Sequence, residues 1–266
     1  MPPHTLAARV DRLRSLAERD ARVEGVLLYG SWTTGEADEH SDLEAYVYVR
    51  DPEGFDAREF VAGIAPVRLA RTNMFGILAV VFDDLMRGEF HVEPADAVEE
   101  LRSWRGSVHL PDPGAAVLLD RTGRLTEAAK TLTEPLRPDP AGTAQRGADE
   151  LAVWTLMLTD LLARGEVARA HNLLHAMVSP QQLKLLRLLR GSTDHWLTPS
   201  RGLERDVPAA DLERYRRTTG PALPEETRAA ARESWAWTRD LVAEAADRWG
   251  VTHPADLHEA IADRLA

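Results

Sequence analysis

The chain contains no cysteine, which excludes disulfide bonds, thiolate nucleophiles and metal centres built on sulfur. It also lacks any apolar run that approaches the roughly 20 residues needed to cross a bilayer. The first twenty residues carry charges every few positions, a pattern that predicts neither a signal peptide nor a membrane anchor. We therefore expect a soluble, cytoplasmic protein without a membrane partner.

Positive charge is in deficit, because 32 Lys and Arg face 43 Asp and Glu and the formal net charge is −11. Nucleic acid phosphates require a basic surface, so this balance argues against a nucleic acid partner. A small neutral or cationic substrate fits the charge better.

The 266 residues suffice for two domains, and a segment rich in proline at 134–142 (EPLRPDPAG) is the best linker. Apolar periodicity before it predicts a helix near 6–17, a second at 57–64, and strands at 26–29, 43–49, 77–82, 89–92 and 115–119. After it the pattern predicts helices alone, at 148–163, 166–177, 180–189, 224–249 and 255–265. We predict an α+β fold: a mixed β-sheet flanked by helices over residues 1–135, then a helical bundle over 143–266.

A small-residue turn, Gly30-Ser31, follows the first predicted strand and precedes a possible short helix at 32–36. Backbone N–H groups and a hydroxyl without bulky neighbours suit an anion. The simpler interpretation is an ordinary tight turn in which serine caps the helix.

Two acids, Asp42 and Glu44, lie at the start of the next predicted strand. Side chains two apart on a strand share a face, so these carboxylates would repel each other unless a positive group lay between them. Hard oxygen ligands beside a phosphate-binding turn suit Mg²⁺ in phosphoryl transfer. Alternatively, both acids lie on an exposed strand edge in water.

The segment YGSWTTGEADEHSDLEAYVYV, with LMRGEFH, ARGEVARA and DHWL further along, resembles the lincosamide nucleotidyltransferases of the two-domain type, within the DNA polymerase β-like superfamily. The resemblance implies that Gly30 and Ser31 hold the triphosphate of ATP or another nucleoside triphosphate, and that Asp42 and Glu44 bind Mg²⁺, as two ions. It further implies that Glu89 is the general base. Glu44 departs from the aspartate that many members of the superfamily have.

Other acids compete with Glu89 for that role, namely Asp83 and Asp84, although both resemble a turn between strands. From the residues alone, Glu89 shares a polar strand face with His91 and Glu93, which could point at a cleft or at solvent.

Cations interrupt the apolar helices of the second half, where a triphosphate would need them. Arg169 and Lys184 are the candidates for nucleotide binding, although helices usually carry such residues on a solvated face. His171 and His175, four apart, have the spacing of a metal pair but no third ligand nearby, which favours packing or surface roles. Five of the seven tryptophans follow residue 150, and one or two of them, or Tyr46 and Tyr48, could line a pocket.

The resemblance thus implies an enzyme that moves AMP, or another nucleoside monophosphate, to a hydroxyl of a small-molecule antibiotic, a lincosamide, and releases pyrophosphate. It also implies a homodimer whose C-terminal domain binds substrate. Two alternatives stay open: an aminoglycoside nucleotidyltransferase with the same site chemistry, and a nucleotidyltransferase-like antitoxin that binds a partner.

Overall fold

The computed structural model describes residues 5–266 and divides the chain into two compact units. The N-terminal unit ends at Leu136, and the C-terminal unit is Arg137–Ala266. Each unit has its own hydrophobic core and is described by itself.

A six-stranded sheet forms the centre of the N-terminal unit, with the strand order β3-β4-β5-β2-β1-β6. Strands β2 and β5 pair in parallel, whereas every other neighbouring pair is antiparallel. The strands are β1 (Val23–Leu28), β2 (Leu43–Val49), β3 (Val67–Thr72), β4 (Leu78–Phe82), β5 (Arg87–Pro94) and β6 (Val117–Asp120). The sheet is mixed, and with the helices around it and the helical second half it confirms the predicted α+β class.

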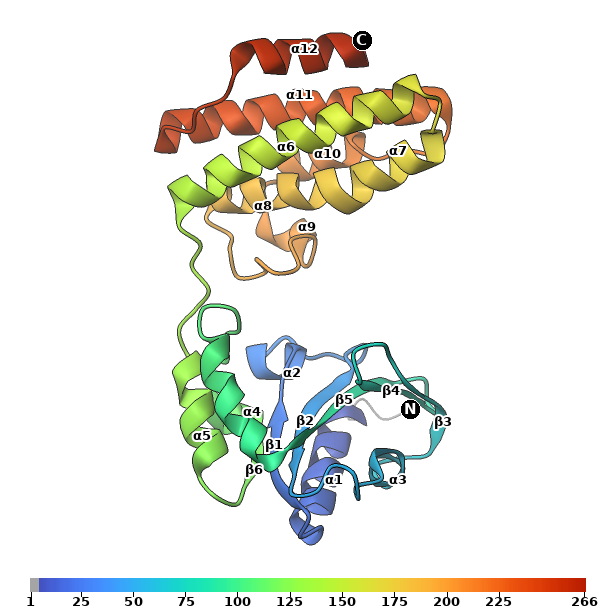
Figure 1. Cartoon of the computed structure of the whole chain (residues 1–266), viewed down its shortest axis with the longest axis vertical. Helices are drawn as coiled ribbons and strands as arrows, with labels where there is room; N and C mark the ends of the chain where they lie inside the picture. Colours follow the sequence, from blue (N-terminus) through green and yellow to red (C-terminus); the bar gives the residue numbers. More distant parts are fainter. Residues whose placement is uncertain (1–4) are drawn as a thin grey trace. The chain divides into compact units, whose positions relative to one another are not determined.

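Helices cover both faces of this sheet (Figure 1). The α-helices of the unit are α1 (Thr5–Arg19), α2 (Ser31–Thr34), α3 (Ala57–Ala62), α4 (Pro113–Ala116) and α5 (Arg124–Ala129). Two 3₁₀ segments, η1 (Ala95–Trp104) and η2 (Lys130–Leu132), complete it.

The alternation of side chains along β2 separates two cores. Leu43, Ala45 and Val47 point to the face that α1 and α3 cover, where they are fully buried among apolar side chains. The opposite face is closed by η1 and α5 around Tyr48, which is 1% exposed. That second cover leaves Glu44 half-buried two residues before Tyr46, so one end of this face stays accessible.

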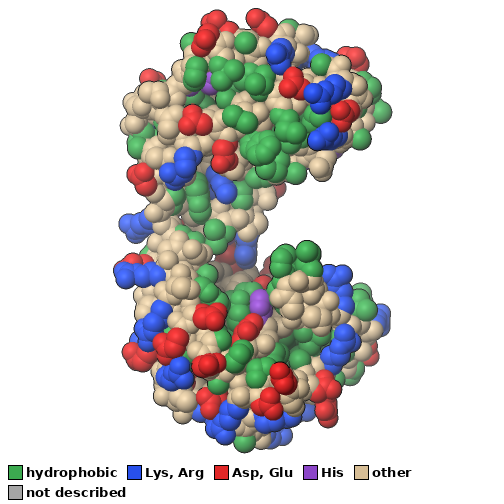
Figure 2. Space-filling view, viewed as in Figure 1, with side chains coloured by type: hydrophobic (Ala, Val, Ile, Leu, Met, Phe, Trp, Pro, Cys, Tyr) green, Lys and Arg blue, Asp and Glu red, His purple; other side chains and the backbone are tan. Residues whose placement is uncertain are grey.

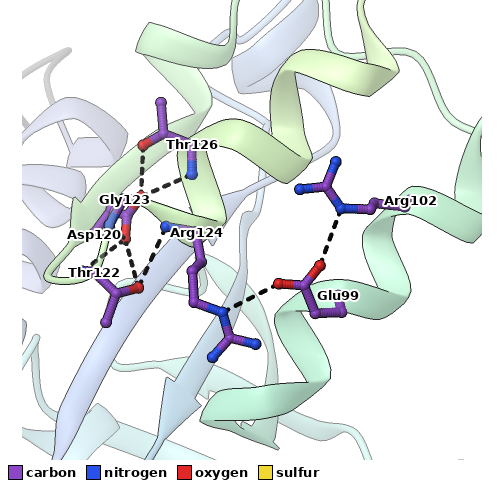
Figure 3. A network of polar contacts seen from close by, with 7 residues as sticks. All are labelled: Glu99, Arg102, Asp120, Thr122, Gly123, Arg124 and Thr126. Carbon is purple, nitrogen blue, oxygen red and sulfur yellow. Dashed lines mark hydrogen bonds and ion pairs between the residues drawn. The ribbon is translucent and has the colours of Figure 1, made fainter.

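A polar network fixes the turn from β6 into α5 (Figure 3). Asp120 accepts hydrogen bonds from the Thr126 N–H at 2.8 Å and its hydroxyl at 2.7 Å, and from the Gly123 N–H at 2.8 Å. Burial opposes ionisation of this carboxyl, but these bonds hold the pKa of Asp120 below its usual value. Nearby, Arg124 reaches Glu99 of η1 at 3.1 Å, which ties α5 to η1 across the sheet face.

The C-terminal unit is entirely helical around one core (Figure 1). Its long helices α6 and α11 pack against each other, and α7, α8 and α12 pack against α6. Trp235 and Trp237 of α11 are each 2% exposed, so both are core residues. The helices are α6 (Pro140–Ala163), α7 (Val167–Leu173), η3 (Leu174–Val178, a π-helical segment), α8 (Ser179–Arg190), α9 (Leu203–Asp206), α10 (Ala209–Arg217), α11 (Pro224–Trp249) and α12 (Ala255–Leu265).

Several elements differ from the sequence prediction. Strand β3 was not predicted, because it is an edge strand whose side chains are all partly or fully exposed and so carries no buried apolar run. Helix α6 starts at Pro140, inside the predicted linker, because Asp139 caps its first turn by accepting the Gly142 N–H at 2.9 Å. Helix α10 was also missed, since Leu212 is its only buried residue.

Acidic and basic side chains are interspersed on the face of each unit drawn in Figure 2. Within residues 5–266, no helix is both long and apolar enough to cross a membrane.

Candidate functional site

The turn after β1 places Gly30 directly against the acid-bearing strand. Gly30 has φ 71° and ψ −148°, a conformation open essentially to glycine alone. A Cβ added there would overlap the Glu44 carboxylate, with the Glu44 Cδ only 2.6 Å away. The Tyr29 N–H also donates to the Glu44 carbonyl at 3.2 Å. The glycine turn and the second acid of the pair therefore touch, and the absent side chain is what makes room for the carboxylate.

Ser31 begins α2 beside this contact. The residue is 8% exposed, and its hydroxyl oxygen has no hydrogen-bond partner among the described residues. Burying a hydroxyl without a hydrogen-bond partner destabilises the fold, because the hydroxyl gives up its hydrogen bonds to water. Among the described residues, the Ser31 hydroxyl thus lacks the hydrogen bond that a buried hydroxyl usually makes.

Asp42 lies just before β2, two residues from Glu44. Its carboxylate forms an ion pair with Arg87 of β5, at 3.2 Å between Arg87 Nη2 and Asp42 Oδ2. Asp42 is about one quarter exposed and Arg87 about two thirds exposed, so water screens this pair. A positive group does accompany the paired acids, and in the protein alone it is a guanidinium.

Glu89 reaches the same place from the neighbouring strand. The parallel register of β2 and β5 sets Glu44 opposite Glu89 and Tyr46 opposite His91. Opposed residues on paired strands point to the same face, and adjacent strands are roughly 4.8 Å apart. The three acids Asp42, Glu44 and Glu89 thus gather at one end of one sheet face.

Aromatic rings close the inner side of this cluster. The His91 ring stacks on Tyr46 with centroids 4.0 Å apart, and His91 Nε2 shares a hydrogen bond with the Tyr29 hydroxyl at 3.1 Å. Burial lowers the pKa of His91, which favours its neutral form. Burial first, and then the charges of Glu44 and Glu89, raise the pKa of Tyr29, so its phenol stays protonated and can donate.

The competing acids lie elsewhere. Asp84 pairs with Arg9 of α1 at 2.7 Å, and Asp83 is exposed, with Arg68 at 3.9 Å. The suggestion that Tyr48 lines a pocket is wrong, because η1 and α5 bury it completely. Tyr46 does border the acid cluster, through its contact with His91.

The predicted cations of the second half make different contacts. Arg169 of α7 is exposed and pairs with Glu166 one turn away, at 3.2 Å. Lys184 of α8 holds its ammonium 5.9 Å from the Trp196 ring. Lys184 and Trp196 line a pocket of about 370 Å³ within the C-terminal unit, and Arg169 is not among the lining residues.

The histidine pair of α7 and η3 packs rather than forming a ligand cluster. His171 and His175 meet edge to face at 4.4 Å, and His171 Nε2 contacts the Gly220 carbonyl at 2.9 Å. Burial, and then His171, lower the pKa of His175.

Over residues 5–266, no three His, Asp or Glu side chains gather closely enough to hold a metal ion by themselves. Mg²⁺ nonetheless often binds one or two carboxylates and takes its other ligands from water and substrate phosphates. The pair Asp42 and Glu44 provides that donor set. The Ser31 hydroxyl, unpartnered among the described residues, is likewise compatible with a phosphate beside it.

Sequence reasoning missed Arg87 and Tyr29. Arg87 precedes Glu89 by two residues, so the period of a strand could have placed both on one face. Tyr29 carries no such signal, because its proximity to Glu89 depends on the order of β1, β2 and β5.

Comparison with known proteins gives one family match and distant structural neighbours. Residues 148–262 match the family model described as "Lincosamide nucleotidyltransferase-like, C-terminal domain". An aminoglycoside 6-adenyltransferase from Bacillus subtilis aligns with 14% identity over 100% of this chain and 98% of its own, with a TM-score of 0.45. A nucleotidyltransferase-like protein from Exiguobacterium sibiricum aligns with 15% identity over 91% of this chain and 77% of its own, with a TM-score of 0.39. No curated protein matches the sequence.

The family match confirms, over residues 148–262, the resemblance to lincosamide nucleotidyltransferases that the sequence motifs suggested.

Proposed function

We propose that the protein transfers a nucleoside monophosphate, AMP from ATP, to a hydroxyl of a lincosamide antibiotic and releases pyrophosphate. The single observation that carries this proposal is the convergence of Gly30, Ser31, Asp42, Glu44 and Glu89 at one end of one sheet face. A turn of small residues beside three carboxylates suits a nucleotide and its metal better than it suits an apolar ligand. The family match of the C-terminal unit supports the same reaction class.

The roles of the residues follow from their positions. Asp42 and Glu44 would hold Mg²⁺, two ions, with the nucleotide phosphates as further ligands, and bound Mg²⁺ would neutralise charge that develops on those phosphates. The Ser31 hydroxyl, buried and unpartnered within the described chain, would donate to a phosphate oxygen. The lack of a side chain at Gly30 leaves room for the Glu44 carboxylate.

Glu89 would act as the general base. It would take the proton from the acceptor hydroxyl while that oxygen attacks the α-phosphorus. A new P–O bond forms, the bond between the α-phosphorus and the bridging oxygen breaks, and pyrophosphate leaves. Burial, and then the charges of Glu44 and Glu89, raise the pKa of Tyr29. Its phenol is therefore a neutral hydrogen-bond donor beside both carboxylates.

Arg87 has a role that follows from its pairing. In the protein alone, its guanidinium offsets the charge of Asp42. A metal ion on Asp42 would compete for the same carboxylate and release Arg87, leaving its exposed side chain to contact the phosphates. Arg169 and Lys184 remain proposed contacts of the nucleotide, and the homodimer remains a proposal from the resemblance.

The decisive test combines mass spectrometry with an Asp42→Asn variant. Lincomycin incubated with the protein, ATP and Mg²⁺ should gain one AMP. Asp42→Asn should abolish this product while the thermal unfolding curve stays close to that of the wild type, because the change removes a metal ligand's charge but almost no volume.

Glu39→Gln is the matched control, since Glu39 lies in the same loop with its side chain three quarters exposed. It should transfer AMP like the wild type. Undiminished transfer by Asp42→Asn would refute the metal-binding role, and transfer to an aminoglycoside but not to lincomycin would refute the lincosamide assignment.

A further inference from the structure

A pocket lies on the same sheet face as the acid cluster, immediately beyond Glu89. It has a volume of about 190 Å³ and lies over β3, β4 and β5. Glu89 and Asp42 line one side of it, and Leu69 and Arg71 of the edge strand line the other. The general base proposed above therefore faces a pocket that the nucleotide turn at Gly30 does not border.

Strand register explains its shape. Glu89 pairs with Ala79, which in turn pairs with Arg71, so these three side chains form one row across the strands. Arg87, Val81 and Leu69 form the next row by the same pairings. The floor of the pocket is formed by the apolar side chains of the middle strand β4, Ala79 and Val81. Longer side chains from β3 and β5 stand at the two ends of each row.

The charges of the lining cancel. Arg71 and Arg87 are offset by Asp42 and Glu89, and Arg87 is already paired with Asp42. A cationic group placed beside Arg71 would still be repelled locally, because like charges a few ångströms apart are unfavourable even when partly screened.

We propose that this pocket is the acceptor subsite, and that Arg71 makes it selective for an acceptor with an apolar portion and at most one positive charge. The inference rests on the proposed function, because it assigns the acceptor to the pocket beside Glu89. Leu69, Ala79 and Val81 contact the apolar portion, while Arg71 donates hydrogen bonds to hydroxyl or carbonyl oxygens and repels polycations.

The absence of cysteine allows a direct test of location. Leu69→Cys introduces the only thiol at a position that is 56% exposed, so a small neutral maleimide should reach it. Lincomycin at ten times its dissociation constant should slow that modification about tenfold. Arg68→Cys is the matched control: Arg68 neighbours Leu69, is about 60% exposed, and does not line the pocket. Its modification should not change.

Selectivity is tested with Arg71→Glu and its control Arg68→Glu. Reversing the charge at Arg71 should raise kcat/KM for kanamycin relative to lincomycin about tenfold, with an unchanged KM for ATP. Arg68→Glu should leave the ratio as in the wild type. An unchanged ratio in Arg71→Glu would overturn the selectivity role.

The outcomes separate this inference from the proposed function. AMP transfer to lincomycin without protection of the Leu69→Cys thiol would overturn the subsite and leave the reaction intact. Protection without any AMP transfer by the wild type would support the pocket and refute the reaction. Equal protection by kanamycin would overturn the preference for low charge.

Discussion

The contact between Gly30 and Glu44 makes Gly30→Ala a sharp perturbation of the site. An alanine Cβ would lie 2.6 Å from the Glu44 Cδ, well inside van der Waals contact. Because Glu44 presents the end of a flexible side chain there, the carboxylate is expected to swing away rather than the backbone to open. The backbone strain of alanine at φ 71° should also lower the free energy of unfolding by about 1–3 kcal/mol.

Gly35→Ala is the matched control for that strain. Gly35 ends α2 with φ 73°, and a Cβ there would meet no atom within 4 Å. Its cost is about 1–2 kcal/mol from the left-handed conformation alone. Gly30→Ala should lose at least as much stability in urea unfolding as Gly35→Ala, so transfer measured on fully folded protein reports the displacement of Glu44.

AMP transfer should fall about 100-fold or more in Gly30→Ala, since misplacing a group at a reacting centre by about 1 Å has effects of that size. It should stay within a few fold of the wild type in Gly35→Ala. The reasoning is refuted if Gly30→Ala retains wild-type transfer, or if Gly35→Ala loses as much.

Two further predictions concern stability. Burial lowers the pKa of His91 below 6.5, so the unfolded chain binds this proton first and the stability from the neutral ring is lost as pH falls through the folded pKa. His91→Phe should flatten the pH dependence of the free energy of unfolding below pH 6.5, and an unchanged slope would contradict the burial argument. Asp120→Asn should cost about 2 kcal/mol in urea unfolding, because an amide accepts fewer of the bonds from α5. Asp83→Asn, on an exposed turn, should cost almost nothing, and equal losses in the two would contradict the network's role.

Patterns within a few consecutive residues predicted the helices that such patterns mark. The predicted bounds of α11 (Pro224–Trp249) and α12 (Ala255–Leu265) agree with the structure, because proline at the start and an apolar stripe mark a helix in the sequence itself. The shared face of Glu44 and Tyr46 followed from the period of a strand.

Local sequence patterns did not predict which strands pair or which elements cover each face of the sheet. The edge strand β3 was missed because its position comes from hydrogen bonds to β4, and only the presence of η1 and α5 explains why Tyr48 is buried while Tyr46 borders the acids. The ion pair of Arg87 and Asp42 likewise depends on β5 lying beside β2.

The sequence by itself determined which groups the protein has: a glycine-serine turn, two acids spaced to share a strand face, and no thiol. Tertiary structure alone decided where those groups meet. Glu89 is 45 residues beyond Glu44 in the chain, yet the parallel register of β2 and β5 makes them neighbours. The physical reason is that side-chain periodicity is a property of a few consecutive residues, whereas strand order and register are set by hydrogen bonding and burial across the whole sheet.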